Sequence, residues 1–321
     1  MPDSSPWDEI RIPDSDFNVR QVAGDTSVPC YWGRDSDGAS LFIMELAGDH
    51  TVQYRKNVTK VNGIEVDLRN GAGIQRLILT LGKQVDHDLF AGLCHTLVSS
   101  LAHASDSSSS LAVALTHLGR WKSFLAGRSG QHLSAEEVRG LFAELVFLSE
   151  LLDRFASMTD AVMAWLGPEK SHQDFIFGNT AVEIKSLSGR ERSTVRISSE
   201  DQLESLNDAL FLRTYRLSNL HDAPKAQSLN EIVAKVQSAL SDATTVDEFD
   251  RKLVAYGYAP LPEYDEPRFV VGDVSTFRVK DSFPKLIRSA LPEGVTKVSY
   301  EIRLEAIASF LCDNETVFVG G

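Results

Sequence analysis

Two hydrophobic patterns follow one another along the first half of the chain. Between residue 17 and about residue 81, short runs rich in Val, Ile, Leu and Phe are separated by Gly, Asn and Asp, which predicts strands and turns. From about residue 86, apolar residues recur at three- and four-residue spacing, which predicts helices. We therefore expect a β-rich N-terminal region followed by helices.

The predicted strands of the β-rich region include Ser40–Leu46, Thr51–Tyr54 and Ile74–Leu81. The sequence Asn70-Gly71-Ala72-Gly73 comes just before the last of these strands. A phosphate-binding loop is one interpretation of its glycines, but the Lys-Ser/Thr pair of a P-loop is missing and no helix follows. A plain turn is the favoured interpretation.

Three helices are predicted next, at Asp86–Ala104, Leu111–Leu125 and Ser134–Phe155. The third begins with Ser134 and has Glu137 three residues later, which is the pattern of a capping box. This pattern predicts that the third helix begins at Ser134.

Strands and helices alternate after Pro168. Short strands are predicted at Asp174–Phe177, Thr180–Ser186 and Thr194–Ile197, and a helix is expected to begin near Ser198 or Ser199. Farther along, the pattern predicts strands at Ala209–Leu217 and Arg268–Val279, helices at Leu229–Leu240 and Val246–Tyr256, and a final strand–helix pair within Val295–Cys312.

This order of elements predicts an α/β protein of the α+β type. We expect a β-rich N-terminal domain at 1–85, a helical connector at 86–130, and an α/β domain with a C-terminal extension at 131–321.

The composition, with 43% hydrophobic and 24% charged residues, is that of a globular protein. No apolar run approaches the roughly 18 residues of a membrane span. The acidic start, MPDSSPWDEI, lacks the basic and apolar segments of a signal peptide. We therefore expect a cytoplasmic protein with no membrane partner. The three cysteines, Cys30, Cys94 and Cys312, lie far apart, which argues against a disulfide framework or a structural zinc site.

One strand carries a candidate catalytic pair. Because successive side chains of a strand point to opposite faces, Glu183 and Lys185 share one face while Val182 and Ile184 point to the other. Asp174 opens the preceding predicted strand, and Gly178-Asn179 is a two-residue turn of the kind that joins antiparallel strands. Such a hairpin would bring Asp174 beside Glu183 and Lys185.

This arrangement suits the hydrolysis of phosphodiester bonds. The carboxylates of Asp174 and Glu183 can hold one or two Mg²⁺ ions, which prefer oxygen ligands, and the Ile184 carbonyl is a further candidate ligand. A bound metal ion would polarise the phosphate and lower the pKa of a bound water. Lys185 would orient or deprotonate that water, or neutralise charge on the phosphate.

Acid-x-lysine triplets also arise by chance, so the alternative for this one is an exposed charged pair on an edge strand. The chain offers a comparison in Asp250-Arg251-Lys252, which has the same spacing but lies in a predicted helix. Residues i and i+2 do not share a face of a helix. We expect that second triplet to be surface charge without a function.

The order Gly140-x-x-x-Glu144 on a helix, then Asp174, then Glu183-x-Lys185 resembles the PD-(D/E)XK, or restriction endonuclease-like, superfamily. More closely, the chain is similar to an uncharacterised bacterial family of PD-(D/E)XK motif proteins. The segments that carry this second resemblance are GLFAELVFLSELL, Trp165-x-Gly167-Pro168, His172-x-Asp174-Phe175 and VEIKS. In one departure from the motif name, Gln173 stands in place of proline before Asp174.

The resemblance implies an αβββαβ core, DNA cleavage that depends on Mg²⁺, with Mn²⁺ as an alternative ion, and a restriction or anti-phage setting. It makes Glu144 a supporting catalytic carboxylate and metal ligand, for which the alternative is an exposed helix charge. It also places Gln202, on the helix expected after the third strand, near the site. The alternative for Gln202 is a solvated polar residue.

A cluster of basic residues follows the catalytic pair, although the net charge of the chain is −13. A local basic patch is enough for phosphate contacts, even in an acidic protein. Arg190, Arg192 and Arg196 are therefore candidate nucleic-acid-binding residues, with solvated loop charge as the alternative. Candidates that would extend the patch are Arg213, Arg216 and Lys225.

Taken together, the residues and the resemblance predict an endonuclease that acts on DNA, as a homodimer or within a multi-subunit defence complex. The alternative from another class is a catalytically inactive subunit that serves as a DNA-binding or scaffolding module in such a complex. A third possibility is a chance triplet in an unrelated α/β enzyme.

Overall fold

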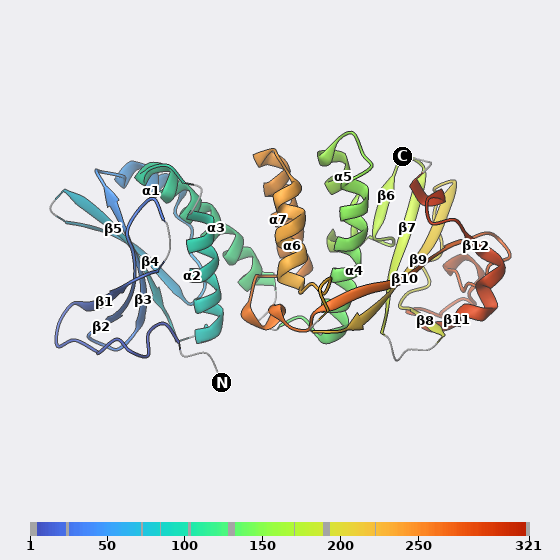
Figure 1. The fold of residues 1–321 in the computed structure, drawn as a ribbon, viewed down its shortest axis with the longest axis horizontal. Coiled ribbons are helices and arrows are strands. Elements are labelled where there is room, and N and C mark those ends of the chain that lie inside the picture. The colour runs from blue at the N-terminus through green and yellow to red at the C-terminus, as the bar shows by residue number, and fades with distance from the viewer. Residues whose placement is uncertain are drawn as a thin grey trace. The chain divides into compact units, whose positions relative to one another are not determined.

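The computed structural model describes residues 5–23, 26–71, 73–83, 85–101, 104–127, 132–169, 171–188, 193–221 and 223–318. The chain forms two compact units, one of Met1–His132 with Gly257–Leu261 and the other of Leu133–Tyr256 with Pro262–Gly321 (Figure 1). Each unit has its own sheet and its own helices.

The first unit contains an antiparallel sheet of five strands in the order β1-β2-β3-β5-β4. The strands are β1 (Phe17–Gln21), β2 (Cys30–Asp35), β3 (Ser40–Ala47), β4 (Ile64–Asn70) and β5 (Ile74–Leu81), and the helices are α1 (Thr51–Asn57), α2 (His87–Leu101) and α3 (Ser107–Gly127). Phe90 of α2 stacks on Trp7, which also contacts Trp32 of β2 edge-on. These buried rings join the helix to the sheet.

One predicted strand of this unit is wrong, because Thr51–Tyr54 lies in helix α1. The β-branched residues Thr51 and Val52 suggested a strand. Val52 is 83% exposed, however, so it does not pack in the core as a half-buried strand residue would. The Asp49 carboxylate accepts the Thr51 N–H at the start of the helix, and Arg55 and Lys56 favour its C-terminal end.

The glycines before β5 form a turn, as expected. The Gly71 N–H donates to the Ile74 carbonyl between the antiparallel strands β4 and β5, and Gly73 has a φ of 79°, a conformation that favours glycine.

The second unit contains a mixed sheet in the order β12-β10-β9-β7-β6 and a separate pair, β11-β8. Its strands are β6 (Phe175–Phe177), β7 (Thr180–Ser188), β8 (Thr194–Ile197), β9 (Ala209–Asn219), β10 (Phe269–Arg278), β11 (Tyr300–Arg303) and β12 (Leu311–Cys312). Its helices are α4 (Ala135–Leu152), α5 (Met158–Ala164), α6 (Leu229–Ala239) and α7 (Ala243–Tyr256), and its 3₁₀ turns are η1 (Gly167–Glu169), η2 (Pro262–Asp265), η3 (Arg288–Ala290), η4 (Leu304–Phe310) and η5 (Thr316–Phe318).

Strand β7 lies inside this sheet. It pairs with β6 in antiparallel fashion and with β9 in parallel over its whole length, from Thr180 opposite Ala209 to Ser188 opposite Leu217. The interpretation of Glu183 and Lys185 as an exposed charged pair on an edge strand is wrong, because β7 lies between two strands of the sheet and the two side chains are only 1% and 15% exposed. The expected α+β fold is confirmed.

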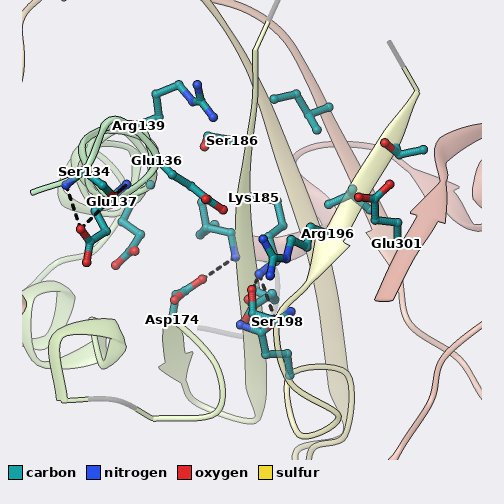
Figure 2. Close-up of a pocket in the computed structure, with 18 of the residues that line it drawn as sticks. Ser134, Glu136, Glu137, Arg139, Asp174, Lys185, Ser186, Arg196, Ser198 and Glu301 are labelled. Carbon is teal, nitrogen blue, oxygen red and sulfur yellow. Dashed lines mark hydrogen bonds and ion pairs between the residues drawn. The ribbon is translucent and has the colours of Figure 1, made fainter. Parts of the chain in front are cut away.

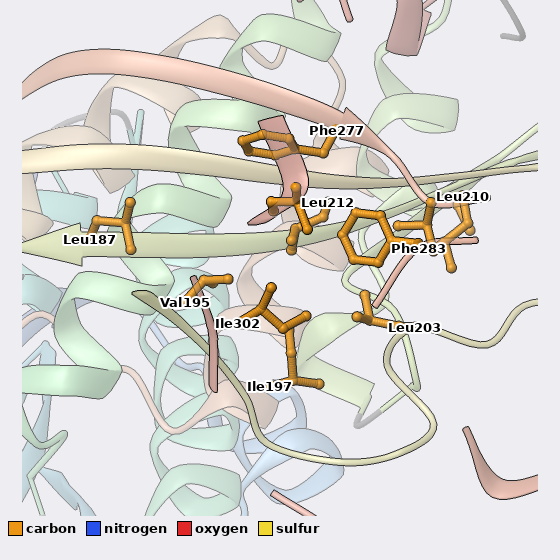
Figure 3. Packing of buried hydrophobic residues seen from close by; sticks show 12 residues of the cluster. Leu187, Val195, Ile197, Leu203, Leu210, Leu212, Phe277, Phe283 and Ile302 are labelled. Atoms are coloured by element: carbon orange, nitrogen blue, oxygen red, sulfur yellow. The ribbon is translucent and has the colours of Figure 1, made fainter. Parts of the chain in front are cut away.

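The β8–β11 pair packs onto the mixed sheet. Figure 3 shows Val195 and Ile302 facing Leu187, Leu212 and Phe277, and all five side chains belong to one buried cluster. This packing fixes β8, and the turn that follows it, beside β7.

The capping box predicted for α4 is confirmed, since Ser134 and Glu137 exchange side-chain and backbone hydrogen bonds. The helix predicted near Ser198 is wrong, because the described residues between β8 and β9 form turns. There the Ser198 N–H donates to the Gln202 side chain, and Ser199 bonds Asp201, so side chains replace helical hydrogen bonds. The predicted C-terminal helix is the 3₁₀ segment η4.

Candidate active site

A pocket of about 760 Å³ lies in the second unit, between the start of α4, strand β7 and the turn after β8 (Figure 2). The structure brings together in its lining all the described residues that the sequence predicted for the site: Glu144, Asp174, Glu183, Ile184, Lys185, Arg196 and Gln202. Arg190 and Arg192 lie outside the described residues.

The β6–β7 hairpin holds Asp174 against β7. Phe175 pairs with Val182, and the Gly178-Asn179 turn joins the two strands, so the hairpin prediction is confirmed. The Asp174 carboxylate accepts the backbone N–H of Ile184 at 2.7 Å. Burial raises the pKa of Asp174, while Lys185 and the Ile184 N–H oppose this shift.

Glu183 and Lys185 form a buried ion pair on the same face of β7. The Lys185 Nζ lies 2.7 Å from Glu183 Oε1, and the two side chains are 15% and 1% exposed. Burial and the nearby Asp174 carboxylate raise the pKa of Glu183 to about 8, against the lowering effect of Lys185. Burial disfavours the charged form of Lys185, but Glu183 and Asp174 outweigh it and raise the pKa of Lys185.

One oxygen of this ion pair has no partner. Glu183 Oε2 is buried, and no described residue forms a hydrogen bond with it. Burying a carboxylate oxygen without a hydrogen bond is costly, so such an atom calls for an explanation in a native protein. A cation bound in the pocket would supply one.

Glu144 is buried on α4, at 6% exposure, so the interpretation of it as an exposed helix charge is wrong. Its Oε2 accepts the Trp165 indole N–H at 2.7 Å, and its carboxylate also interacts with the Tyr256 hydroxyl. Burial, followed by the charges of Asp174 and Glu183, raises the pKa of Glu144 well above its usual range.

Gly167 lets Glu144 and Asp174 approach each other. A Cβ at this position would lie 2.5 Å from Glu144 Oε2 and 3.2 Å from Asp174 Oδ1. The Gly167 and Leu166 N–H groups both donate to the Asp174 carbonyl, at 3.0 and 2.7 Å. Only glycine therefore fits between the two carboxylates.

Gln202 and Arg196 lie on the other side of Lys185. Gln202 is in a turn rather than on a helix, and its Oε1 accepts from Lys185 Nζ at 3.0 Å, so it is not merely a solvated residue. Arg196 is exposed on β8 and contacts Ser299 at 3.3 Å. Arg213, a candidate to extend the basic patch, is instead 3% exposed and ion-paired with Glu150 at 2.7 Å, so it does not belong to a nucleic-acid surface.

The expectation for the second triplet is also wrong. Lys252 is fully buried, and its Nζ donates to the Trp165 carbonyl at 2.6 Å and to Glu169 Oε1 at 2.9 Å. Lys252 therefore supports Trp165, which in turn bonds Glu144.

Sequence reasoning gave no role to Trp165, Gly167 and Tyr256. The first two fall in the Trp165-x-Gly167-Pro168 segment, so its resemblance to the family was a usable signal. Tyr256 ends α7, more than a hundred residues after Glu144, and no local pattern pointed to it.

Among the described residues, no group of three or more histidine, cysteine, aspartate and glutamate side chains is arranged to hold a metal ion. None of the described helices is long and apolar enough to cross a membrane.

The fold and the site define a protein of the PD-(D/E)XK, restriction endonuclease-like class. The model of the family described as "Putative PD-(D/E)XK family member, (DUF4420)" matches residues 4–305, and the chain belongs to this family. Membership in this family indicates that the protein is nuclease-like. Searches of the curated proteins and of the solved structures gave no match.

Proposed function

We propose that this protein is a Mg²⁺-dependent endonuclease that hydrolyses phosphodiester bonds of DNA, with Mn²⁺ able to replace Mg²⁺. The observation that carries the proposal is the Glu183–Lys185 pair on β7, because the second carboxylate oxygen of Glu183 is buried and accepts no hydrogen bond from the described residues, in a pocket that Asp174 and Glu144 also line.

The oxygen atoms of the pocket fit a hard cation. Magnesium is bound in such enzymes by one or two carboxylates, with water and substrate phosphate as the other ligands, so a group of three acidic side chains is not required. Asp174 and Glu183 would hold the ion, with Glu144 as a supporting ligand. The raised pKa values of all three carboxyls fit a site whose negative charges need a cation.

The Ile184 carbonyl is the fourth proposed ligand. The N–H and C=O of one strand residue point toward the same neighbouring strand. Since the Ile184 N–H points to Asp174, its carbonyl lies on the same side of β7, beyond the last β6 pair at Val182. The bound ion would polarise the scissile phosphate and lower the pKa of a water bound to it.

Lys185 would stabilise negative charge on the phosphate. The neighbouring carboxylates raise its pKa, which favours a charged ammonium group over a neutral amine that could act as a base. Gln202 orients this ammonium group from one side and Glu183 from the other. Arg196, on the rim of the pocket, would contact a DNA phosphate, and Arg190 and Arg192 are proposed for the same role.

We place this activity in a bacterial restriction or anti-phage system. Cutting both strands of DNA together usually uses two such sites, so we propose a homodimer or a multi-subunit defence complex. A DNA substrate also favours a cytoplasmic location. The acidic charge of the chain, −13, favours targeting by a partner over strong DNA affinity of its own.

Nicking of supercoiled plasmid tests the proposal. Wild-type protein is expected to cut with Mg²⁺ or Mn²⁺ and to stop when EDTA removes the metal. Asp174→Ala and Lys185→Ala should both abolish cleavage while remaining folded. Absence of cleavage by the wild type, with either metal and with modified or unmodified DNA, would favour the inactive DNA-binding or scaffolding module instead.

A further inference from the structure

Gln173, the residue directly before Asp174, is buried at 4% exposure. Its side-chain Nε2 lies within hydrogen-bond distance of three main-chain carbonyls, those of Asp201 at 3.1 Å, Gln202 at 3.4 Å and Glu204 at 2.9 Å. These carbonyls belong to the turn that connects β8 to β9. One amide group therefore ties the start of β6 to that turn.

The same turn carries Gln202, whose side chain forms a hydrogen bond with Lys185. The Gln202 Oε1 accepts from Lys185 Nζ at 3.0 Å and from the Ser198 N–H at 2.8 Å. Besides Glu183, Gln202 is the group among the described residues that holds the Lys185 ammonium by a hydrogen bond. The path from Gln173 to Lys185 by way of the turn thus runs through one residue, Gln202, and it is separate from the backbone link between Gln173 and Asp174.

Only a donor serves at position 173. Proline, which stands before the aspartate in the motif name, has no side chain that could reach the three carbonyls. Glutamate would point carboxylate oxygens at carbonyl oxygens, and methionine has a similar length but no donor. The glutamine therefore has a task that the motif does not specify.

Other contacts keep the turn folded without Gln173. Leu203 is fully buried in the cluster beneath the sheet, and Arg288 forms an ion pair with Asp201 at 3.1 Å. Loss of the Gln173 donor should therefore shift the turn rather than unfold the unit.

We propose that Gln173 is a positioning residue, which holds the turn at residues 199–204 so that Gln202 orients Lys185. The proposal deepens the proposed nuclease function and rests on it for its activity readout.

Gln75 offers a matched control in the other unit. It is also 4% exposed, and its Nε2 also has three acceptors, on Asp49, Thr51 and Asn70, at 3.0, 2.9 and 2.7 Å. Gln75→Met removes the same kind of buried donor as Gln173→Met, far from the proposed chemistry in the sequence.

The first experiment compares the Mg²⁺-dependent cleavage rates of Gln173→Met, Gln202→Ala, the double variant and Gln75→Met. Gln173→Met should lower kcat between about ten- and a hundredfold, because a small misplacement of a reacting group has such an effect, with little change in KM. In the Gln202→Ala background, Gln173→Met should have less than about a twofold effect, since both act through one contact. Independent, multiplicative losses, or an equal loss in Gln75→Met, would overturn the proposal.

The second experiment needs no cleavage. Hydrogen exchange of the metal-free protein should become faster at the Ser198 amide and through residues 199–204 in Gln173→Met, and unchanged there in Gln75→Met. Unchanged exchange in Gln173→Met would overturn the proposal. If the wild type cuts no DNA, the nuclease function fails, and this exchange measurement still decides whether Gln173 positions the turn.

Discussion

Two acid-x-lysine triplets of the second unit both end in a lysine with little exposed surface, 15% for Lys185 and 0% for Lys252, but the surroundings of the two lysines differ. Lys185, on strand β7, is paired with the acid of its own triplet and lines the pocket. Lys252, on helix α7, is fully buried against the Trp165 carbonyl and Glu169, while the acid of its triplet, Asp250, bonds Gln237.

The difference follows from the secondary structure. On a strand, residues i and i+2 share a face, so acid and lysine meet. On a helix they do not, so each finds a partner elsewhere. Spacing in the sequence therefore does not distinguish the proposed catalytic lysine, Lys185, from the structural Lys252, whereas the secondary structure that carries each of them does.

The largest expected effect separates the two lysines by activity. Lys185→Met should lower the rate of Mg²⁺-dependent plasmid cleavage about a hundredfold or more, because it removes the ammonium group proposed to stabilise negative charge on the reacting phosphate. Lys252→Met should lower the rate, per folded molecule, by less than about tenfold, since Lys252 reaches Glu144 only through Trp165 and touches no substrate. Initial rates measure both. An equal loss in Lys252→Met would break the comparison.

Substitution of Lys252 should affect the stability of the fold more than the rate of cleavage. Lys252→Met removes the donor from the buried Trp165 carbonyl and should lower the free energy of unfolding by about 2 kcal/mol. Arg251→Met, at the exposed neighbouring position, should change it by less than about 0.5 kcal/mol. Urea unfolding followed by circular dichroism gives both values. A Lys252→Met protein as stable as the wild type would mean that the buried contact contributes nothing.

The carboxyls that pair with the two lysines should respond to pH in opposite directions. The folded pKa of Glu183, about 8, lies above its ordinary 4.5, so its contribution to stability is present below pH 4.5 and is lost as pH rises through 8. A hydrogen bond from Lys252 lowers the pKa of Glu169, so its contribution is present above the ordinary value and is lost on acidification.

Glu183→Gln should therefore make the metal-free protein more stable above pH 8, by about 1 kcal/mol or more. Glu169→Gln should instead flatten the loss of stability in acid. Unfolding free energies between pH 4 and pH 9 test both expectations. A Glu183→Gln profile parallel to that of the wild type would show that Glu183 does not titrate in this window.

The smallest expected effect concerns DNA affinity. Arg196→Ala should weaken DNA binding a few-fold and reduce the salt dependence of binding by about one phosphate contact. Arg251→Ala removes another exposed arginine, from the helical triplet, and should do neither. Fluorescence anisotropy at several salt concentrations measures the slope. The same slope for both variants would remove Arg196 from the proposed DNA surface.

Local patterns predicted the parts of the site that are close in the sequence. Alternation along β7 placed Glu183 and Lys185 on one face, and the Gly178-Asn179 turn brought Asp174 to Ile184. Both follow from turn chemistry and strand period, which act over a few residues.

Local sequence patterns could not predict the contacts between segments that are far apart in the sequence. The bond from Trp165 to Glu144, the contact of Tyr256 with Glu144 and the burial of Lys252 depend on how helices pack against the sheet. The expected helix at Ser198 failed for a related reason, because the Gln202 side chain takes the Ser198 N–H and Gln173 holds the turn from outside it.

The central claim is that Asp174 and Glu183 bind the metal ion of a nuclease, and direct titration of the protein with Mn²⁺ tests it without any knowledge of the DNA target. Wild type and Arg251→Met, which changes an exposed arginine that touches none of the proposed ligands, should bind Mn²⁺ with the same affinity in calorimetry, whereas Asp174→Asn should bind at least about tenfold more weakly because it loses a charged oxygen ligand. Equal affinity in wild type and Asp174→Asn would show that Asp174 is not a ligand of the metal ion.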